Sequence, residues 1–189
     1  MKSTLPGSLP QRAPWWWYPQ AGASNESLSP RHFTAVSPGQ HWIRAINVDA
    51  TPKELFAWVT QLRRAPYSYD WADNFGRRSP QTIDRNLVNV AVGDSVMTIF
   101  TVIAVVPGTS MTVSMNKGTP TSLFGSLTVH YEVEPRAASS RLIVQMVVPR
   151  PPGPLTTFRR YALAWGDLLM MRKQLRELKR LAEMSAALN

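Results

Sequence analysis

The chain has 189 residues, a net charge of +9 and no cysteine. These values fit one domain with an appendage, and they exclude disulfides, cysteine-ligated zinc and thiol chemistry. The positive charge raises nucleic acid and anionic membranes as partners, but the basic residues are spread along the chain and no five like charges adjoin.

The chain is expected to be cytoplasmic. No apolar run reaches the roughly 18 residues of a membrane span. The start, "MKSTLPGSLPQ", has no apolar core behind Lys2, so it does not resemble a secretory signal.

Residues 1–40 are predicted to form a Pro-rich extension, and residues 41–189 the folded domain. Six prolines punctuate the first forty residues without an apolar period. Within them lies "PWWWYP", whose four adjacent aromatics at 15–18 are unfavourable in water. Docking on the chain's own domain is the first expectation, with a partner or a membrane interface as alternatives.

The domain is expected to begin with a strand at "HWIRAINVDA" (41–50), followed by a capped helix. Thr51 is the expected N-cap, Pro52 occupies the first helical position and Glu54 completes a capping box. Leucine, tryptophan and valine then recur three and four positions apart through "ELFAWVTQL", which predicts one apolar face.

The next stretch, "YSYDWADNFGR" (67–77), predicts a short helix from Tyr69 to Phe75 that ends at Gly76. One interpretation is structural, with caps, a buried aromatic face and surface ion pairs to nearby arginines. The other places Tyr69, Asp70, Trp71 or Asn74 at the mouth of a pocket. The sequence favours the first and leaves the second open.

Residues from about 87 to 149 are strand-like and predict an antiparallel meander. "VGDSVMTIFTVIAVV" is β-branched and ends at the turn Pro107–Thr109. Apolar and polar residues alternate in "SMTVSM" and in "SLTVHYEVEP", and the second segment is predicted to be a half-buried strand. "RLIVQMVV" follows a turn.

A long helix is predicted from about Leu155 to the end of the sequence. Gly166 in mid-helix is unfavourable by about 1 kcal/mol relative to alanine, which suggests close approach of another group. The predicted apolar stripe comprises Phe158, Ala162, Trp165, Leu168, Leu169, Leu175, Leu178 and Leu181.

This order of elements predicts an α+β fold in which a curved antiparallel sheet wraps around the C-terminal helix. A curved sheet cannot meet a straight helix everywhere, so an apolar cavity is expected between them. The residues expected to line it are Phe100, Met111, Met115, Tyr131, Met146, Trp165 and Leu169, with Tyr69, Trp71 and Asn74 at its mouth.

The strand at 41–48, "DATPKELFAWVTQL", "YSYDWADNFGR" and "VGDSV", closed by a long amphipathic helix, resemble the START-like helix-grip superfamily over residues 41–185. Polyketide cyclases, lipid-transfer domains and plant pathogenesis-related proteins belong to it. The resemblance implies binding of a lipid-like or polyketide-like molecule in the cavity. It implies no cofactor, and no widely shared catalytic set can be carried over.

Two alternatives accompany ligand binding. A cyclase or dehydratase needs a group that polarises a carbonyl and a base near neutral pH. Tyr69, Arg78 and Tyr131 are candidates for the first role, and Asp70 for the second if burial raises its pKa. A basic membrane-surface module is the other alternative, carried by the last helix and the four N-terminal aromatics.

Metal binding and nucleic-acid binding are not expected. His32, His41 and His130 lie far apart in the sequence, and no phosphate loop, nucleophile elbow or nucleic-acid motif appears.

Overall fold

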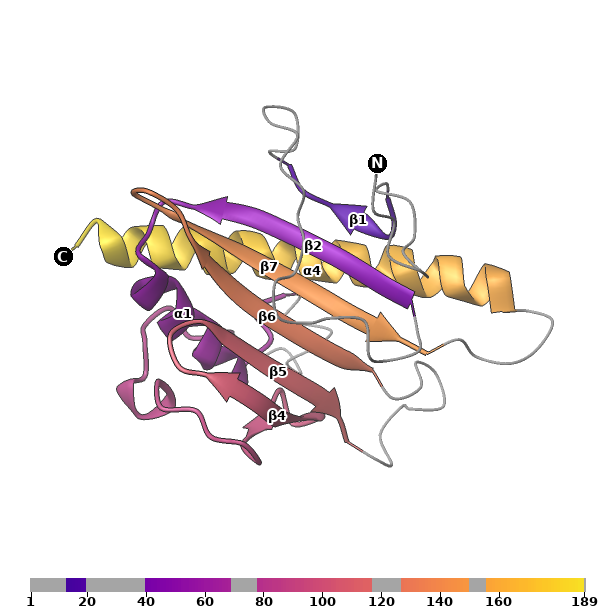
Figure 1. Cartoon of the computed structure of the whole chain (residues 1–189), viewed down its shortest axis with the longest axis horizontal. Coiled ribbons are helices and arrows are strands. Elements are labelled where there is room, and N and C mark those ends of the chain that lie inside the picture. The colour runs from indigo at the N-terminus through magenta and orange to yellow at the C-terminus, as the bar shows by residue number, and fades with distance from the viewer. Residues whose placement is uncertain (1–12, 20–39, 69–77, 117–126, 150–155, 189) are drawn as a thin grey trace, which may run out of the picture.

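The protein is represented by a computed structural model that describes residues 13–19, 40–68, 78–116, 127–149 and 156–188 (Figure 1). These residues form seven strands in one sheet, two α-helices and two short 3₁₀ helices. The elements are β1 Trp16–Trp17, β2 Gln40–Val48, α1 Pro52–Thr60, η1 Gln61–Arg63, η2 Arg85–Leu87, β3 Ser95–Val96, β4 Phe100–Val106, β5 Ser110–Met115, β6 Thr128–Pro135, β7 Ser140–Val148 and α4 Thr156–Ala186.

The sheet has the strand order β1-β2-β7-β6-β5-β4-β3. Every neighbouring pair is antiparallel except β1 and β2, which run parallel. Helix α4 lies along β2 on one face of the sheet, and α1 lies on the same side near the C-terminal end of α4 (Figure 1). The predicted α+β helix-grip arrangement is confirmed by this topology.

Helix α1 begins where the sequence predicts. The Thr51 side chain accepts a hydrogen bond from the Glu54 backbone N–H, and the Glu54 carboxylate accepts one from the Thr51 backbone N–H. This reciprocal pair satisfies two donors that a helix start leaves without intrahelical partners. The helix then buries Leu55, Trp58 and Val59 in the core.

The β-branched run at 92–106 folds as a hairpin rather than as one continuous strand. Met97 and Thr98 both adopt positive φ values, 49° and 60°, between the short β3 and the longer β4. A positive φ interrupts an extended strand and turns the chain. The predicted turn after β4 is present, with Gly108 at φ 76° and the Thr109 N–H donating to the Val106 carbonyl at 3.0 Å.

Strand β6 is largely buried on both faces, so the prediction that it is half-buried is wrong. Strand β7 is buried at every position. Tyr131 and Val133 face the side of the sheet that carries α4, as their alternation predicts. His130 and Glu132 point to the opposite side and are nevertheless buried. The alternation of apolar and polar residues therefore predicted which side of the sheet each residue faces. It did not predict that the residues on the outer side are also buried.

Helix α4 packs through only part of the predicted stripe. Leu168, Leu175, Leu178 and Leu181 are buried, together with Ala164, Met171 and Ala182. The other predicted members, Phe158, Ala162, Trp165 and Leu169, lie on the exposed side of the helix. The first half of α4 thus carries two apolar stripes on different sides, because residues 168 and 169 are already about 100° apart around a helix of 3.6 residues per turn.

The aromatic segment at 15–18 docks on the chain's own domain, as first expected. Because β1 pairs with β2, its side chains alternate across the sheet edge. Trp15 and Trp17 belong to the core shared with α4, whereas Trp16 and Tyr18 pack against Ile143 on the other face. The extension predicted at 1–40 therefore contributes one strand to the sheet, and the boundary at residue 40 stays a prediction.

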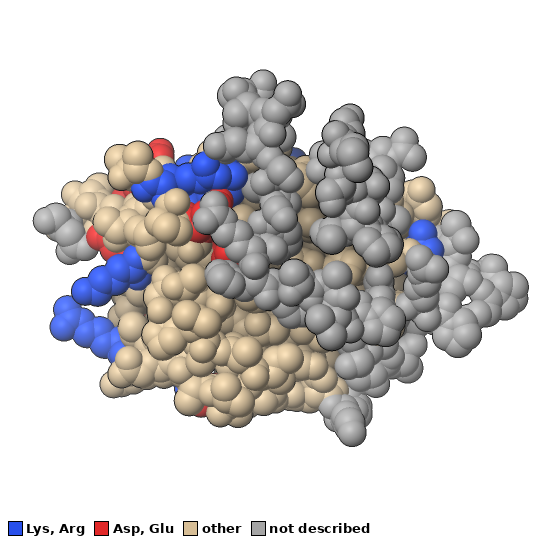
Figure 2. Space-filling view, viewed as in Figure 1, with Lys and Arg blue, Asp and Glu red and all other residues tan. Residues whose placement is uncertain are grey.

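The face of the sheet turned away from α4 is the one seen in Figure 2, partly behind residues that are not described. In Figure 2 the described lysines and arginines gather mostly toward the end where the C-terminus lies, and the surface over β4 and β5 is uncharged. Within the described ranges, no helix is both long enough and apolar enough to cross a bilayer.

Replacing Gly166 with alanine should stabilise the fold by about 1 kcal/mol in urea unfolding, because glycine is a poor helix former. The expectation that another group approaches Gly166 closely is not met by the described residues. Apart from its chain neighbours and the surrounding helix backbone, none has an atom within 4 Å of the position that an alanine Cβ would take. Gly108→Ala is the control, and it should lower stability by about 1 kcal/mol because φ there is +76°. Destabilisation by Gly166→Ala would contradict this account.

Trp15→Ala should destabilise the protein by about 3–5 kcal/mol, the usual loss for a buried large aromatic. Phe158→Ala should change stability by no more than about 0.5 kcal/mol, because Phe158 is exposed. Thermal and urea unfolding of both variants measure the difference. Equal, small effects would show that the N-terminal segment does not belong to the folded core.

Candidate functional site

The candidate site is the inner face of the sheet, where strands β2 and β4–β7 face α4 and α1. Met111 pairs with Tyr131, Val129 with Met146, and Phe100 with Met115 in the strand register. Five of these six residues were predicted to face the interior, the exception being Val129. All five are buried and belong to one core cluster with residues of α1 and α4. The structure therefore places Phe100, Met111, Met115, Tyr131 and Met146 in one buried cluster on the inner face of the sheet, and their role as a ligand-binding lining stays a prediction.

A buried cation interrupts this apolar wall. Arg44 lies on β2 between Trp42 and Ile46 on the same face, and its side chain is fully buried. Its Nη2 donates to Asp167 Oδ2 on α4 at 3.0 Å. Its Nη1 donates to the Trp15 carbonyl at 2.8 Å and to the Ile43 carbonyl at 3.0 Å. One guanidinium thus joins the N-terminal segment, the sheet and α4.

A second polar connection crosses the interior further along α4. The Tyr131 hydroxyl on β6 donates to Gln174 Oε1 at 3.2 Å. Gln174 Nε2 in turn donates to the Pro66 carbonyl, which follows η1, at 2.6 Å. Buried polar side chains require such partners, so this chain of hydrogen bonds fixes how α4 is rotated against the sheet.

The electrostatics of the site depend on Asp167. Burial raises the pKa of Asp167 to about 6, and the Arg44 cation opposes that rise. Burial also raises the pKa of Tyr131, and the nearby Asp167 charge adds to the effect. Arg44 keeps its charge because a guanidinium does not deprotonate in proteins. At neutral pH the site therefore holds the ion pair of Arg44 with Asp167 and the neutral phenol of Tyr131.

Trp15 packs between β2 and the first half of α4. Its ring lies 5.9 Å from the Trp42 ring and 5.0 Å from the Tyr161 ring, the latter in an edge-on arrangement. The Arg160 guanidinium lies 5.5 Å from the Trp15 ring centroid. A residue of the predicted extension thus forms part of the wall at this end of the interior.

Two donors on this wall have no acceptor among the described residues. The Trp42 indole Nε1 and the Arg44 Nε are both buried, and neither makes a hydrogen bond there. A buried donor left without an acceptor is unfavourable by about 1–3 kcal/mol. The two residues are neighbours on the inner face of β2.

The remaining predicted site residues have different outcomes. Tyr69, Asp70, Trp71 and Asn74 lie outside the described residues, so their roles stay predictions. Arg78 is exposed.

Trp165 and Leu169 were expected on the face of α4 that meets the sheet, and this is wrong. Both lie on the exposed side, while their neighbours Leu168 and Met171 are buried. The error arose because the prediction merged the two apolar stripes of the helix.

Sequence reasoning missed Arg44, Asp167, Gln174 and Trp42. A signal for the ion pair was present, because Arg44 occupies an apolar position of an alternating strand. Asp167 is likewise the only acidic residue between 156 and 176. What the sequence could not give was their pairing, since the two residues are 123 positions apart.

The outer face of the sheet carries a row of polar side chains. Gln145 Nε2 lies 2.6 Å from His41 Nδ1, and Gln145 pairs in register with His130. His130 Nδ1 lies 2.8 Å from Thr112 Oγ1. The fold thus places His41 and His130, which are distant in sequence, on either side of one glutamine. Among the described residues, no group of three or more His, Asp or Glu is arranged to hold a metal ion.

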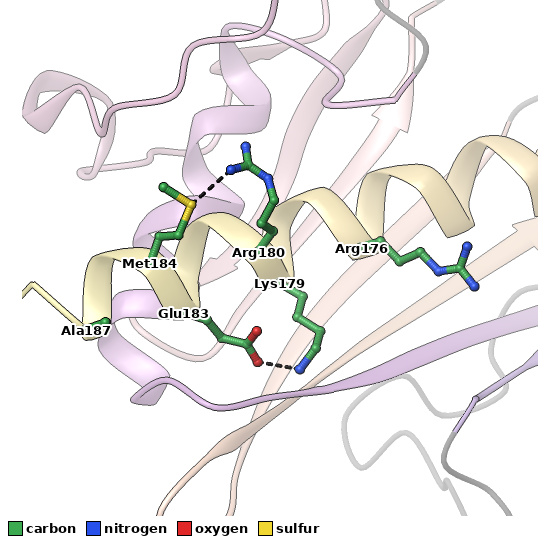
Figure 3. Close-up of a pocket in the computed structure, with 6 residues that line it drawn as sticks. All are labelled: Arg176, Lys179, Arg180, Glu183, Met184 and Ala187. Atoms are coloured by element: carbon green, nitrogen blue, oxygen red, sulfur yellow. Dashed lines mark hydrogen bonds and ion pairs between the residues drawn. The ribbon is translucent and has the colours of Figure 1, made fainter.

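A shallow depression of about 490 Å³ lies on the outer surface of α4 near its C-terminal end (Figure 3). Its lining comes from the C-terminal end of the chain, and in Figure 3 Lys179 turns toward Glu183 while Arg180 points away from both. Because it is open to solvent, it is not the predicted interior cavity. The lining residues are Arg176, Lys179, Arg180, Glu183, Met184 and Ala187.

No protein-family model matches the chain, and no curated protein matches it significantly. Solved structures with a similar fold include a protein from Mesorhizobium loti, with 16% identity, 77% of this chain and 98% of that chain covered, and a TM-score of 0.49. Ara h 8.0201 shares 13% identity over 79% of this chain and 98% of its own, with a TM-score of 0.45.

A further similar structure is the di-domain ARO/CYC StfQ from the steffimycin biosynthetic pathway. It shares 15% identity over 78% of this chain and 51% of its own, with a TM-score of 0.47. At such identities and TM-scores, these similarities extend no further than the general arrangement of helix and sheet.

The stability of the protein should respond to the ionisation of Asp167. Because the pKa is raised to about 6 in the folded state, the folded protein binds the proton more tightly than the unfolded chain does. The stabilisation that comes from this tighter proton binding by Asp167 is complete below about pH 4 and is lost as the pH rises through about 6. With the side chain 17% exposed, the loss should be about 3 kcal/mol.

Urea unfolding of the wild type and Asp167→Asn between pH 4 and 7 measures this effect as the difference between the two proteins. Arg44→Met provides the second comparison, since removing the cation should raise the pKa of Asp167 further and steepen the loss. A wild-type profile parallel to that of Asp167→Asn would contradict the assignment.

Proposed function

We propose that the protein binds a hydrophobic small molecule between the inner face of the sheet and α4, through a polar oxygen of that molecule. The observation that carries the proposal is the pair of buried donors, Trp42 Nε1 and Arg44 Nε, on an otherwise apolar wall. A carbonyl, hydroxyl or carboxylate oxygen would accept from them. The rest of the molecule would contact the methionine-rich surface of β5 and β7.

The composition of this wall supports an apolar ligand body. Met111, Met115 and Met146 provide flexible thioether side chains that adapt to ligands of different shapes. A site of this kind commonly combines a largely apolar surface with a small number of polar groups that orient the ligand. The resemblance to the START-like superfamily noted in the sequence is in keeping with this class of ligand.

Acid–base catalysis is the alternative function, with Asp167 as a second candidate base beside the predicted Asp70. Asp70 lies outside the described residues, whereas the pKa of Asp167 is raised to about 6, near the range useful for a general base. Tyr131 interacts electrostatically with Asp167 and presents a neutral hydroxyl. Cyclisation or dehydration of the bound molecule would use this pair.

Native mass spectrometry of the purified protein tests the binding proposal directly by detecting a co-purified small molecule. Titration with the apolar anionic dye anilinonaphthalene sulfonate provides a quantitative second measurement. Trp42→Phe keeps an aromatic ring but removes the indole N–H, so we expect dye affinity to fall by about tenfold.

Trp165→Phe is the matched control, because Trp165 is exposed on the opposite side of α4. It should leave the affinity unchanged. Equal affinities for the wild type and Trp42→Phe, together with no co-purified molecule, would contradict the proposed site. Reduced affinity in Trp165→Phe alone would place the dye on the outer surface and contradict it equally.

A further inference from the structure

The outer side of the first half of α4 is an exposed apolar surface. Phe158, Trp165 and Leu169 are 78%, 47% and 52% exposed, and they follow one another along one side of the helix. Tyr161 and Met170 extend this surface on its two flanks and are also exposed. Single exposed apolar residues are ordinary, but a continuous group on one helix indicates a surface that another body covers.

The same side of α4 becomes basic toward the middle of the helix. Lys173, Arg176 and Arg180 continue the line of exposed positions after Leu169. Between residues 156 and 176 the sequence has one acidic residue, Asp167, and it faces the interior to pair with Arg44. This stretch of α4 therefore contributes no exposed carboxylate of its own. Directly after it, Glu177 pairs with Arg180 and also interacts with Lys173, whereas Arg176 lies against the Trp17 ring.

Arginines on the adjoining flank are held against β1. The guanidinium groups of Arg172 and Arg176 lie 5.5 and 5.7 Å from the Trp17 ring centroid. These contacts fix cations beside the apolar surface without neutralising them, because an aromatic ring carries no net charge. The apolar surface and its positive border thus adjoin on one side of α4.

We propose that this face, defined by Phe158, Trp165, Leu169, Lys173 and Arg176, docks on the surface of an anionic lipid bilayer with α4 lying in the plane of the interface. Charge complementarity selects this occupant. A second copy of the chain would bring a second positively charged surface to the contact, whereas anionic headgroups would offset the charge of Lys173 and Arg176. Tryptophan and tyrosine side chains also favour the membrane–water interface.

This surface differs from the membrane module considered from the sequence. That alternative relied on the aromatics at 15–18, but Trp15 is buried between β2 and α4 and Trp16 packs on the outer face of the sheet. The anchors proposed here are instead residues predicted to face the core. The proposal also stands apart from the interior site, since it uses the opposite side of α4.

Vesicle flotation with the full chain tests the proposal. The probes are phosphatidylcholine vesicles with and without phosphatidylglycerol, at about 0.1 M and about 1 M salt, where the Debye length falls from about 10 Å to about 3 Å. Wild-type protein should float with the anionic vesicles at low salt. Its binding to neutral vesicles should be several-fold weaker than its binding to anionic vesicles at low salt. At high salt its binding to either kind of vesicle should be similarly weak.

Two double variants separate the apolar and the charged contributions. Trp165→Gln with Leu169→Gln should lower partitioning by about tenfold or more, since two apolar side chains are lost from the contact. Lys173→Gln with Arg176→Gln should lower it by about tenfold or more on anionic vesicles only. Circular dichroism and thermal unfolding confirm that each variant is folded.

The matched controls are exposed residues elsewhere in the fold. Val92→Gln removes an exposed apolar side chain, and Lys53→Gln with Arg85→Gln makes the same change in net charge. Both should bind as the wild type does, and so should Trp42→Phe, which tests only the interior site.

Three results would overturn the proposal. The first is no binding to anionic vesicles, and the second is equal loss in the controls. The third is that the wild type does not bind vesicles but self-associates in sedimentation experiments, and that Trp165→Gln with Leu169→Gln abolishes this self-association. That result would assign the face to a second copy of the chain.

Discussion

The arrangement of the fold depends on one buried guanidinium. Arg44 connects three parts of the chain that are distant in sequence, through bonds to the Trp15 carbonyl, its own strand and Asp167. A buried charge without partners is strongly unfavourable, so the cation is tolerated only when all three parts are in place. The parallel edge strand β1 and the first half of α4 are therefore positioned together.

The two halves of α4 are held by different means. The second half is fixed by polar contacts with the end of β2 and with α1, since Lys179 donates to the Asn47 carbonyl and the Trp58 indole donates to Ser185. The first half has the ion pair at Asp167 and the ring contact between Tyr161 and Trp15. Because these contacts all lie on one side, they leave the outer apolar stripe uncovered.

Local patterns allowed much of the fold to be predicted. The capping box at Thr51, the alternation through β5 and β6 and the turn at Gly108 each follow from neighbouring residues. The rotation of α4 did not follow, because two apolar stripes satisfy the same helical period and only tertiary contacts choose between them. Arg44 and Asp167 were missed because their role is also set by a tertiary contact. Each pairs with a residue more than a hundred positions away.

Both proposals rest on places where the chain departs from what stability alone favours. Replacing a buried ion pair by apolar residues of similar size is often neutral or stabilising, so Arg44 and Asp167 are not explained by stability. On an exposed helix face, polar residues in place of Trp165 and Leu169 would likewise be more favourable. The two departures occur on opposite sides of the same half of α4. Because real proteins concentrate such departures at functional sites, this half of the helix is where the function of the chain is best sought.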